Sequence, residues 1–110
     1  MTTEFLKKAK SKLKKSTEIS EIEIEDVFCD YAKSVGCVAL KLILLNLRGF
    51  PDRTILCTEA RVFFIEFKKK GKKLTPTQKL WKRTLEKLGF QYFVCDEIGQ
   101  AENILQDFLF

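Results

Sequence analysis

Three charged residues lie around two neighbouring apolar runs in the middle of the sequence. Asp52 follows Pro51 at the start of one run, and Glu66 and Lys68 lie two residues apart near the end of the next. Residues two apart in a strand point to the same face, so Glu66 and Lys68 would share one side of a sheet. A carboxylate and an ammonium among apolar side chains cost free energy unless they have partners. We therefore expect these charged side chains to have partners.

The spacing of the two carboxylates suits a shared divalent cation. If the runs pair as a hairpin through Thr58-Glu59-Ala60, Asp52 lies seven residues before Glu59 and Glu66 seven residues after it. Both carboxylates would then emerge near the same end of the sheet. Mg²⁺ favours a few carboxylate oxygens, a backbone carbonyl and several waters. Lys68 could orient or deprotonate an attacking water, or balance the charge on a scissile phosphate.

The elements that must position these residues form one small α/β domain. Apolar residues at helical spacing predict a first helix that stops at Gly36. Thr75-Pro76-Thr77-Gln78 is a capping signature for a later helix, with Thr at the N-cap and Pro at the first helical position. The order helix, three strands, helix, strand, helix predicts a mixed sheet flanked by helices. The expected elements are helix 18–35, strands 40–47, 53–57 and 61–68, helix 76–88, strand 91–95 and helix 101–110.

Charge is unevenly distributed along the 110 residues, although the formal net charge is only +5. Residues 1–17 carry six lysines against one glutamate, and we interpret them as a basic N-terminal arm before a single domain at 18–110. Residues 66–87 carry nine Lys or Arg against two glutamates, whereas residues 18–30 carry six carboxylates and no base. Basic blocks beside an acidic cluster indicate a protein that attracts phosphate and gathers carboxylates at one place. Each block taken alone could also be a solvated surface.

The cysteines and the absence of histidine exclude several kinds of chemistry. The chain has four cysteines, at positions 29, 37, 57 and 95, and no histidine. A zinc site would need all four cysteines, and their spacing is unlike a zinc ribbon, so we expect reduced thiols that fill the core. Without histidine, no Ser-His-Asp triad, Cys-His pair or histidine general base is possible. No apolar run could span a membrane and no signal peptide is evident, so we expect a cytoplasmic protein.

Several motifs together resemble the VRR-NUC branch of the PD-(D/E)xK nuclease superfamily. Pro51-Asp52, followed after thirteen residues by Glu66-Phe67-Lys68, matches the signature of the superfamily. The flanking sequences 49–53, 64–68 and 74–78, with Trp81, narrow the resemblance to VRR-NUC over roughly residues 18–98. The resemblance implies a restriction-endonuclease-like core.

The resemblance also implies roles for individual residues. Asp52, Glu66 and the Phe67 carbonyl would hold Mg²⁺ or Mn²⁺, Lys68 would be the catalytic lysine, and Gln78 would point into the site. The family usually places a further glutamate on the first helix. Glu21 lies three and seven residues before Ile24 and Phe28, on the stripe that faces the core, so we expect it to join the site. Glu25, one turn later and slightly off that stripe, is the second choice.

The function implied is a divalent-metal-dependent endodeoxyribonuclease. No base-reading element is evident, so basic residues would grip the DNA backbone and any selectivity would be for DNA shape. Small stand-alone members of this family resemble homodimeric nucleases of Holliday junctions or other branched DNA, often associated with phages. The expected backbone contacts are Arg53, Lys69, Lys70, Lys72, Lys73, Lys79, Lys82 and Arg83.

Other interpretations remain open for each of these residues. Asp52 could be only a turn former after Pro51, Glu66 and Lys68 an exposed pair on an edge strand, and Gln78 only a capping residue. The whole chain could be a nonenzymatic basic nucleic-acid-binding module with structural carboxylates. It could also keep the fold as an inactive partner subunit, although the combination of Asp52, Glu66, Lys68 and Gln78 argues against loss of function.

Overall fold

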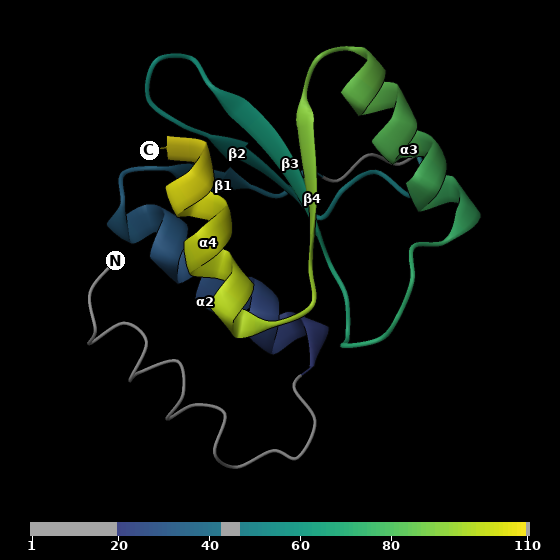
Figure 1. The fold of residues 1–110 in the computed structure, drawn as a ribbon, viewed down its shortest axis with the longest axis horizontal. Coiled ribbons are helices and arrows are strands. Elements are labelled where there is room, and N and C mark those ends of the chain that lie inside the picture. The colour runs from purple at the N-terminus through teal and green to yellow at the C-terminus, as the bar shows by residue number, and fades with distance from the viewer. Residues whose placement is uncertain (1–19, 43–46, 110) are drawn as a thin grey trace.

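The computed structural model describes residues 20–42 and 47–109 (Figure 1). The predicted basic arm at residues 1–17, and the domain start at residue 18, lie outside the described residues. The elements follow the predicted order of helix, three strands, helix, strand and helix. They are α2 (Glu21–Ser34), β1 (Val38–Leu40), β2 (Arg53–Leu56), β3 (Val62–Phe67), α3 (Pro76–Lys87), β4 (Gln91–Cys95) and α4 (Ile98–Leu109).

The four strands form one mixed sheet in the order β1-β2-β3-β4. β1 and β3 both run antiparallel to β2, whereas β4 runs parallel to β3. The parallel pair is possible because α3 carries the chain from the end of β3 back to the start of β4. β3 is therefore a central strand, and its side chains from Phe63 to Phe67 are buried on both faces.

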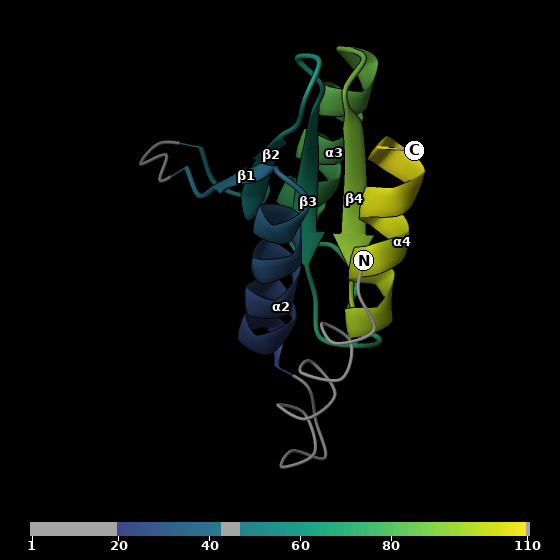
Figure 2. The ribbon, with the colours of Figure 1, turned by 90° about the vertical axis from the view of Figure 1, so that its left-hand side faces the viewer.

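Helices cover the two faces of the sheet (Figures 1 and 2). α2 and α4 lie together against one face, and α3 lies against the other. The main apolar cluster is on the α2–α4 face, where the ring of Phe28 meets the rings of Phe63 and Phe67 edge-on. A smaller cluster around Phe64 and Leu85 is on the α3 face. The α/β class and the mixed sheet predicted from the sequence are confirmed.

The helix signals in the sequence act as expected. The Ser20 hydroxyl accepts a hydrogen bond from the amide of Glu23 and caps α2, and Gly36 follows this helix with a φ of +84°. Thr75 and Gln78 form a reciprocal capping box at the start of α3. Each cap satisfies amides that have no partner within the first turn.

The first strand differs from the prediction of a buried strand over residues 40–47. β1 spans only Val38–Leu40 and is partly exposed, while residues 43–46 lie outside the described residues. β1 is an edge strand, and its length is limited by the part of β2 that it pairs with, from Thr54 to Leu56. An apolar run predicts burial, but it does not specify which of its residues pair with the neighbouring strand. The predicted position was wrong for that reason.

The other helices and strands differ less from their predicted residue ranges. α4 begins at Ile98, three residues before the predicted start. All four cysteines are free thiols; Cys37 and Cys95 are buried in the main cluster, as expected, and the Cys37 thiol contacts the Cys57 sulfur at 3.3 Å. None of the helices within residues 20–42 and 47–109 is long and apolar enough to cross a membrane.

Candidate active site

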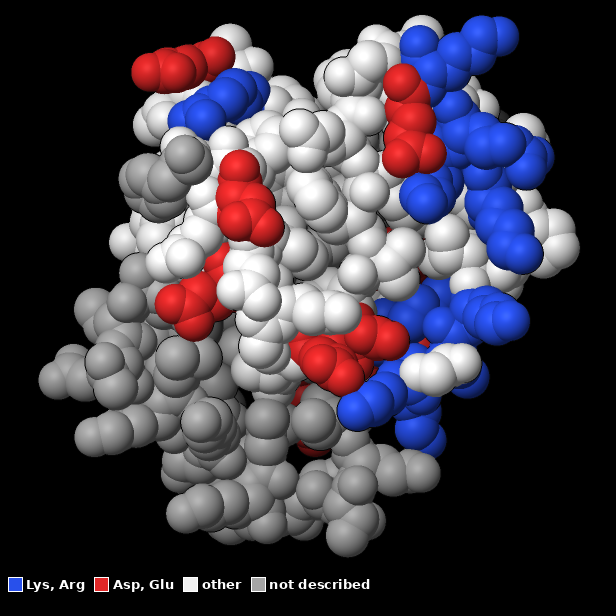
Figure 3. All heavy atoms as spheres, viewed as in Figure 1, with Lys and Arg blue, Asp and Glu red and all other residues white. Residues whose placement is uncertain are grey.

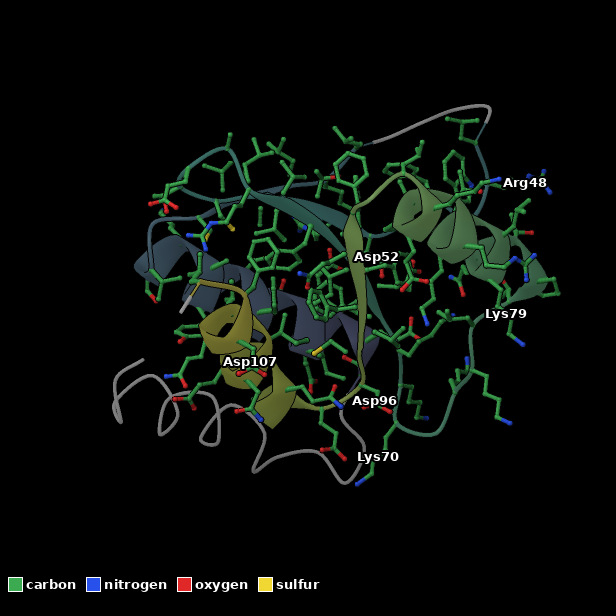
Figure 4. The ribbon with its side chains drawn as sticks, turned by 45° about the horizontal axis from the view of Figure 1, so that its top comes forward. Arg48, Asp52, Lys70, Lys79, Asp96 and Asp107 are labelled. Atoms are coloured by element: carbon green, nitrogen blue, oxygen red, sulfur yellow. The ribbon has the colours of Figure 1, made fainter. Side chains whose placement is uncertain are left out.

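The hairpin of β2 and β3 brings Asp52 beside Glu66, as the residue count predicted. Arg53 pairs with Ile65 in the register, so the next step of the hairpin sets Asp52 opposite Glu66. The Phe67 amide donates a hydrogen bond of 2.9 Å to the Asp52 carboxylate (Oδ2). Asp52 is half-buried, and Figure 4 shows it close to the strands. Asp52 is thus more than a local turn former, because its carboxylate is held by the neighbouring strand.

Glu66 is an ionisable side chain in the middle of the sheet. Phe63, Ile65 and Phe67 pack into the α2–α4 cluster, so the alternation of β3 directs Glu66 toward the α3 face. Glu66 is only 4% exposed, and its Oε1 atom has no hydrogen-bond partner among the described residues. Burial raises its pKa to about 9, and a hydrogen bond with Asp52 and the charge of Asp52 contribute in the same direction. A proton or a cation bound between the two carboxylates would offset the cost of burying Glu66 beside Asp52.

Lys68 supplies one positive charge at this place. Its side chain is 8% exposed, and its charge opposes the rise in the pKa of Glu66. The Lys68 amide donates to the Cys95 carbonyl, so the end of β3 is also held by the end of β4. Glu66 lies on the central strand β3, Lys68 directly follows that strand, and both residues are buried. They are therefore not an exposed pair on an edge strand.

Of the two candidate glutamates on α2, Glu21 contacts the end of β3. Its carboxylate (Oε1) accepts a 3.1 Å hydrogen bond from the Lys69 amide, and its charge raises the pKa of Glu66. Glu25 has different partners, since its carboxylate lies 2.7 Å from the Arg53 guanidinium and 3.7 Å from the Lys41 ammonium. The geometry therefore associates Glu21 with Asp52 and Glu66, and it gives Glu25 a role in joining α2 to the sheet.

Arg53 is also engaged inside the fold. Besides the ion pair with Glu25, its guanidinium donates to the Ala39 carbonyl at 3.3 Å. These contacts link α2, β1 and β2 on the α2–α4 face. A phosphate contact of Arg53 stays a prediction, and a phosphate would have to compete with Glu25 and the Ala39 carbonyl for the Arg53 guanidinium.

The loop that precedes Asp52 is docked on α3. The Phe50 ring packs edge-on against Phe64 and Trp81, and the Trp81 indole donates to the Arg48 carbonyl at 2.9 Å. Gly49 adopts a φ of +80°, and a Cβ atom there would lie 2.6 Å from the Thr77 methyl group. Only glycine suits this backbone and this close approach. The position of Asp52 therefore depends on contacts with α3.

Gln78 occupies the capping box. Its side-chain oxygen accepts a 2.9 Å hydrogen bond from the backbone amide of Thr75, and the backbone amide of Gln78 donates to the Thr75 hydroxyl. This is the capping role that the sequence left open as an alternative. The predicted role of Gln78 in the site stays a prediction, for which its side-chain nitrogen and the second lone pair of its side-chain oxygen are available.

A basic surface lies along α3 and the loop before it. Lys and Arg side chains gather along the right-hand edge of the molecule in Figure 3, and Lys79 points outward from α3 in Figure 4. These side chains border an open cavity of about 430 Å³. The cavity adjoins the carboxylates, because one of its lining residues, Val94, pairs with Glu66 in the register. The cavity is lined by Lys72, Lys73, Leu74, Lys79, Lys82, Arg83, Glu86 and Val94.

Two of the predicted DNA-binding lysines lie outside this cavity. Lys70 is exposed and forms a 3.0 Å ion pair with Glu97. Lys69 is half-buried, and its amide is the group that holds Glu21. The basic residues therefore divide into a group around the cavity and a group at the start of the loop after β3.

The oxygen donors at the end of β3 fit a hard divalent cation. Within residues 20–42 and 47–109, no group of three or more His, Cys, Asp or Glu side chains is close enough to hold a metal as it stands. Asp52 and Glu66 nevertheless converge, and the Glu66 Oε1 atom is buried without a hydrogen-bond partner in the described part of the chain. Carboxylate oxygens, with a backbone carbonyl such as that of Phe67, are the donors that Mg²⁺ and Mn²⁺ prefer.

Comparison with known proteins assigns the chain to a family. A family model of the VRR-NUC domain matches residues 30–97. The chain belongs to the VRR-NUC family. Its relative "Putative nuclease p44" from Acyrthosiphon pisum secondary endosymbiont phage 1 is 33% identical over 78 residues, which cover 71% of this chain and 84% of that protein. Family membership and this relative support a nuclease activity.

A solved structure confirms the architecture of the VRR-NUC fold. A structure described as a VRR_NUC domain superposes with a TM-score of 0.74 at 21% sequence identity, and the match covers 78% of this chain and 94% of that one. VRR-NUC domains belong to the PD-(D/E)xK superfamily. The restriction-endonuclease-like arrangement inferred from the motifs is thereby confirmed.

Sequence reasoning missed two polar residues on the α3 face of this VRR-NUC sheet. Thr54 and Tyr92 both pair with Phe64 in the register, from β2 and β4 respectively. The Thr54 Oγ1 and Tyr92 Oη atoms are buried without a hydrogen-bond partner among the described residues. Burial and the nearby charges of Glu66 and Asp52 raise the pKa of Tyr92, so its hydroxyl keeps its proton. The alternation along β4 could have indicated that Tyr92 is buried. That Tyr92 lies beside Glu66 follows only from the parallel pairing of β3 and β4.

Proposed function

We propose that the protein is a divalent-metal-dependent endodeoxyribonuclease that hydrolyses phosphodiester bonds. The observation that carries the proposal is the buried Glu66 near the end of the central strand β3, with the half-buried Asp52 carboxylate beside it and the buried Lys68 two residues further on. A buried carboxylate next to a second one destabilises a fold unless a proton or a cation compensates it. Family membership in VRR-NUC supports the reaction class.

Asp52, Glu66 and the Phe67 carbonyl would hold the cation, with Glu21 as a further carboxylate beside them. When bound there, a divalent cation supplies Lewis-acid chemistry that neutralises phosphate charge and activates water. Lys68 would contribute a fixed positive charge for the phosphate in the transition state. Water adds to phosphorus, one phosphorus–oxygen bond breaks, and the departing oxygen takes up a proton.

The basic cavity supports DNA as the substrate. Its five cations, at positions 72, 73, 79, 82 and 83, face only one carboxylate, Glu86. Such a surface attracts a phosphate backbone without reading bases. The cavity adjoins Glu66 through Val94, so a backbone bound there would pass the carboxylates.

The decisive experiment incubates the protein with supercoiled plasmid in Mg²⁺, Mn²⁺ or EDTA. The parent protein should nick the plasmid only with a divalent metal, and Asp52→Asn or Lys68→Ala should abolish cleavage while DNA binding persists. Asp96→Asn and Lys33→Ala remove the same charges elsewhere and should cleave normally. Binding without cleavage in any metal would leave a nonenzymatic nucleic-acid-binding module.

We also propose that the enzyme acts as a homodimer on branched or junction DNA. Exposed apolar side chains support an association, since Val38 and Leu56 pair at the β1 edge of the sheet. Leu80 on α3 and Leu88 at its C-cap are exposed as well. Light scattering during gel filtration should report two copies, and a four-way junction should be cut faster than a linear duplex of the same sequence. A monomer that cuts both substrates equally would contradict this part of the proposal.

A further inference from the structure

The α3 face of the sheet contains an unused donor next to an unused acceptor. Tyr92 is 6% exposed, and its hydroxyl has no hydrogen-bond partner among the described residues. The Glu66 Oε1 atom is likewise buried and has no partner there. A phenol that keeps its proton is a donor, and a carboxylate oxygen is an acceptor. Burying a donor and an acceptor without partners costs free energy, unless the two atoms form a hydrogen bond with each other or with a shared water.

The register brings these two side chains to the same face. Tyr92 pairs with Phe64, and Glu66 is two residues farther along β3, where it pairs with Val94. Tyr92 and Glu66 are therefore diagonal neighbours on adjacent strands, a separation that long side chains can bridge. Tyr92 is buried in the same α3-face cluster as Phe64. Glu66 is two residues after Phe64 on β3, so the side chains of Tyr92 and Glu66 point to the same face.

We propose that Tyr92 is a positioning residue for the metal site: when the cation is bound, its hydroxyl donates a hydrogen bond to the Glu66 carboxylate, directly or through one buried water. This inference rests on the proposed function, because it assigns Glu66 to a divalent cation. A carboxylate that binds a cation with one oxygen needs its other oxygen and its rotation fixed by a neighbour. Among residues 20–42 and 47–109, the Glu66 carboxylate has a hydrogen bond only with Asp52, which would itself bind the cation.

The size of the effect can be estimated from the general behaviour of such residues. Loss of a hydrogen bond to a metal-binding side chain typically lowers metal affinity by about 10- to 100-fold. The hydroxyl has no hydrogen-bond partner within residues 20–42 and 47–109, so its removal should not lower the thermal stability in EDTA. A residue with only a packing role would behave in the opposite way, with reduced stability and unchanged metal affinity.

The test compares Tyr92→Phe with the parent in Mn²⁺ titrations followed by calorimetry. We expect Mn²⁺ affinity to fall about tenfold, with an unchanged or higher unfolding temperature in EDTA. Tyr31→Phe is the matched control, since Tyr31 is fully buried in the cluster on the opposite face. It should keep the parent's Mn²⁺ affinity whatever its effect on stability.

A second measurement separates positioning from a general loss of structure. DNA cleavage by Tyr92→Phe should recover toward the parent rate when Mn²⁺ is raised, because the defect is one of metal affinity. Parent-like Mn²⁺ affinity in Tyr92→Phe would overturn the inference and leave the proposed function intact. A parent protein that neither binds Mn²⁺ nor cleaves DNA would instead overturn the proposed function.

Discussion

The two faces of β3 are packed with different kinds of side chain. Toward α2 and α4 the strand presents Phe63, Ile65 and Phe67, which join a large apolar cluster. Toward α3 it presents Phe64 in a smaller cluster and then Glu66, a buried carboxylate whose Oε1 atom has no hydrogen-bond partner among the residues that the structure describes. One strand thus separates a face that stabilises the fold from a face that keeps polar groups available for chemistry. The second arrangement is tolerable because the first supplies the stability.

The largest expected effect tests whether stability lies on the α2–α4 face. Phe63→Ala should lower the free energy of unfolding by about 3–5 kcal/mol, because the ring is fully buried against Phe28, Phe93 and Phe108. Phe64→Ala, on the other face, should cost less, since its cluster is smaller and can relax more. Urea unfolding in EDTA measures both values. Equal costs would contradict the division between the faces.

The next effect tests whether the α3 face depends on a cation. In Glu66→Gln, the stabilisation by Mn²⁺ should disappear, a loss of about 2.7 kcal/mol when the metal is at a hundredfold excess over the parent's Kd. In EDTA the variant should be at least as stable as the parent, because a neutral amide at this buried position avoids the free-energy cost that raises the pKa of Glu66. Thermal unfolding with and without Mn²⁺ gives both numbers, and Glu59→Gln on the exposed hairpin turn should behave like the parent. Retained Mn²⁺ stabilisation would remove Glu66 from the metal site.

A smaller effect concerns the loop that joins the two regions. Gly49→Ala should cost about 1–3 kcal/mol, because an alanine would be strained at this φ and its Cβ would clash with Thr77. Cleavage should fall as well, since the loop positions Asp52. Gly71→Ala is a matched control, as Gly71 also has a positive φ but nothing lies within 4 Å of an added Cβ. If both substitutions lower stability and cleavage equally, the close contact with α3 has no special role.

The smallest effect is expected on the surface. Lys70→Ala should leave the unfolding temperature unchanged, because its ion pair with Glu97 joins two exposed side chains. DNA affinity should fall slightly and the fall should be less at higher salt, as for any phosphate contact. A Lys70→Ala variant whose unfolding temperature drops clearly would show that the loop after β3 is part of the stabilising region.

Much of the fold was predictable because local signals were strong. The capping box at Thr75 and Gln78, the end of α2 near Gly36 and the strand from Gln91 to Cys95 all lie where the sequence placed them. These features depend on residues within a few positions of each other. The strand expected at residues 40–47 was misplaced, because the length of an edge strand is set by its partner and not by its own apolar residues.

The candidate site was predictable to the extent that it lies on one hairpin. The opposition of Asp52 and Glu66 follows from counting residues about the turn at Glu59, whose φ is +64°. The sequence favoured Glu21 over Glu25, since Glu21 lies on the core stripe of α2 and Glu25 lies slightly off it. Only the packing of α2 on the sheet showed that Glu25 meets Arg53 while Glu21 reaches the Lys69 amide.

The sequence by itself determined the identity of the charged residues, the strand faces on which they lie and the helices that border them. These properties follow from periods of two and of 3.6 residues and from caps, which are local. The tertiary structure alone decided that β4 lies parallel beside β3 and that the Asp52 loop docks on α3. It also decided that Tyr92 lies diagonally beside Glu66. Contacts between distant segments depend on which apolar faces bury each other, and no local pattern specifies that choice.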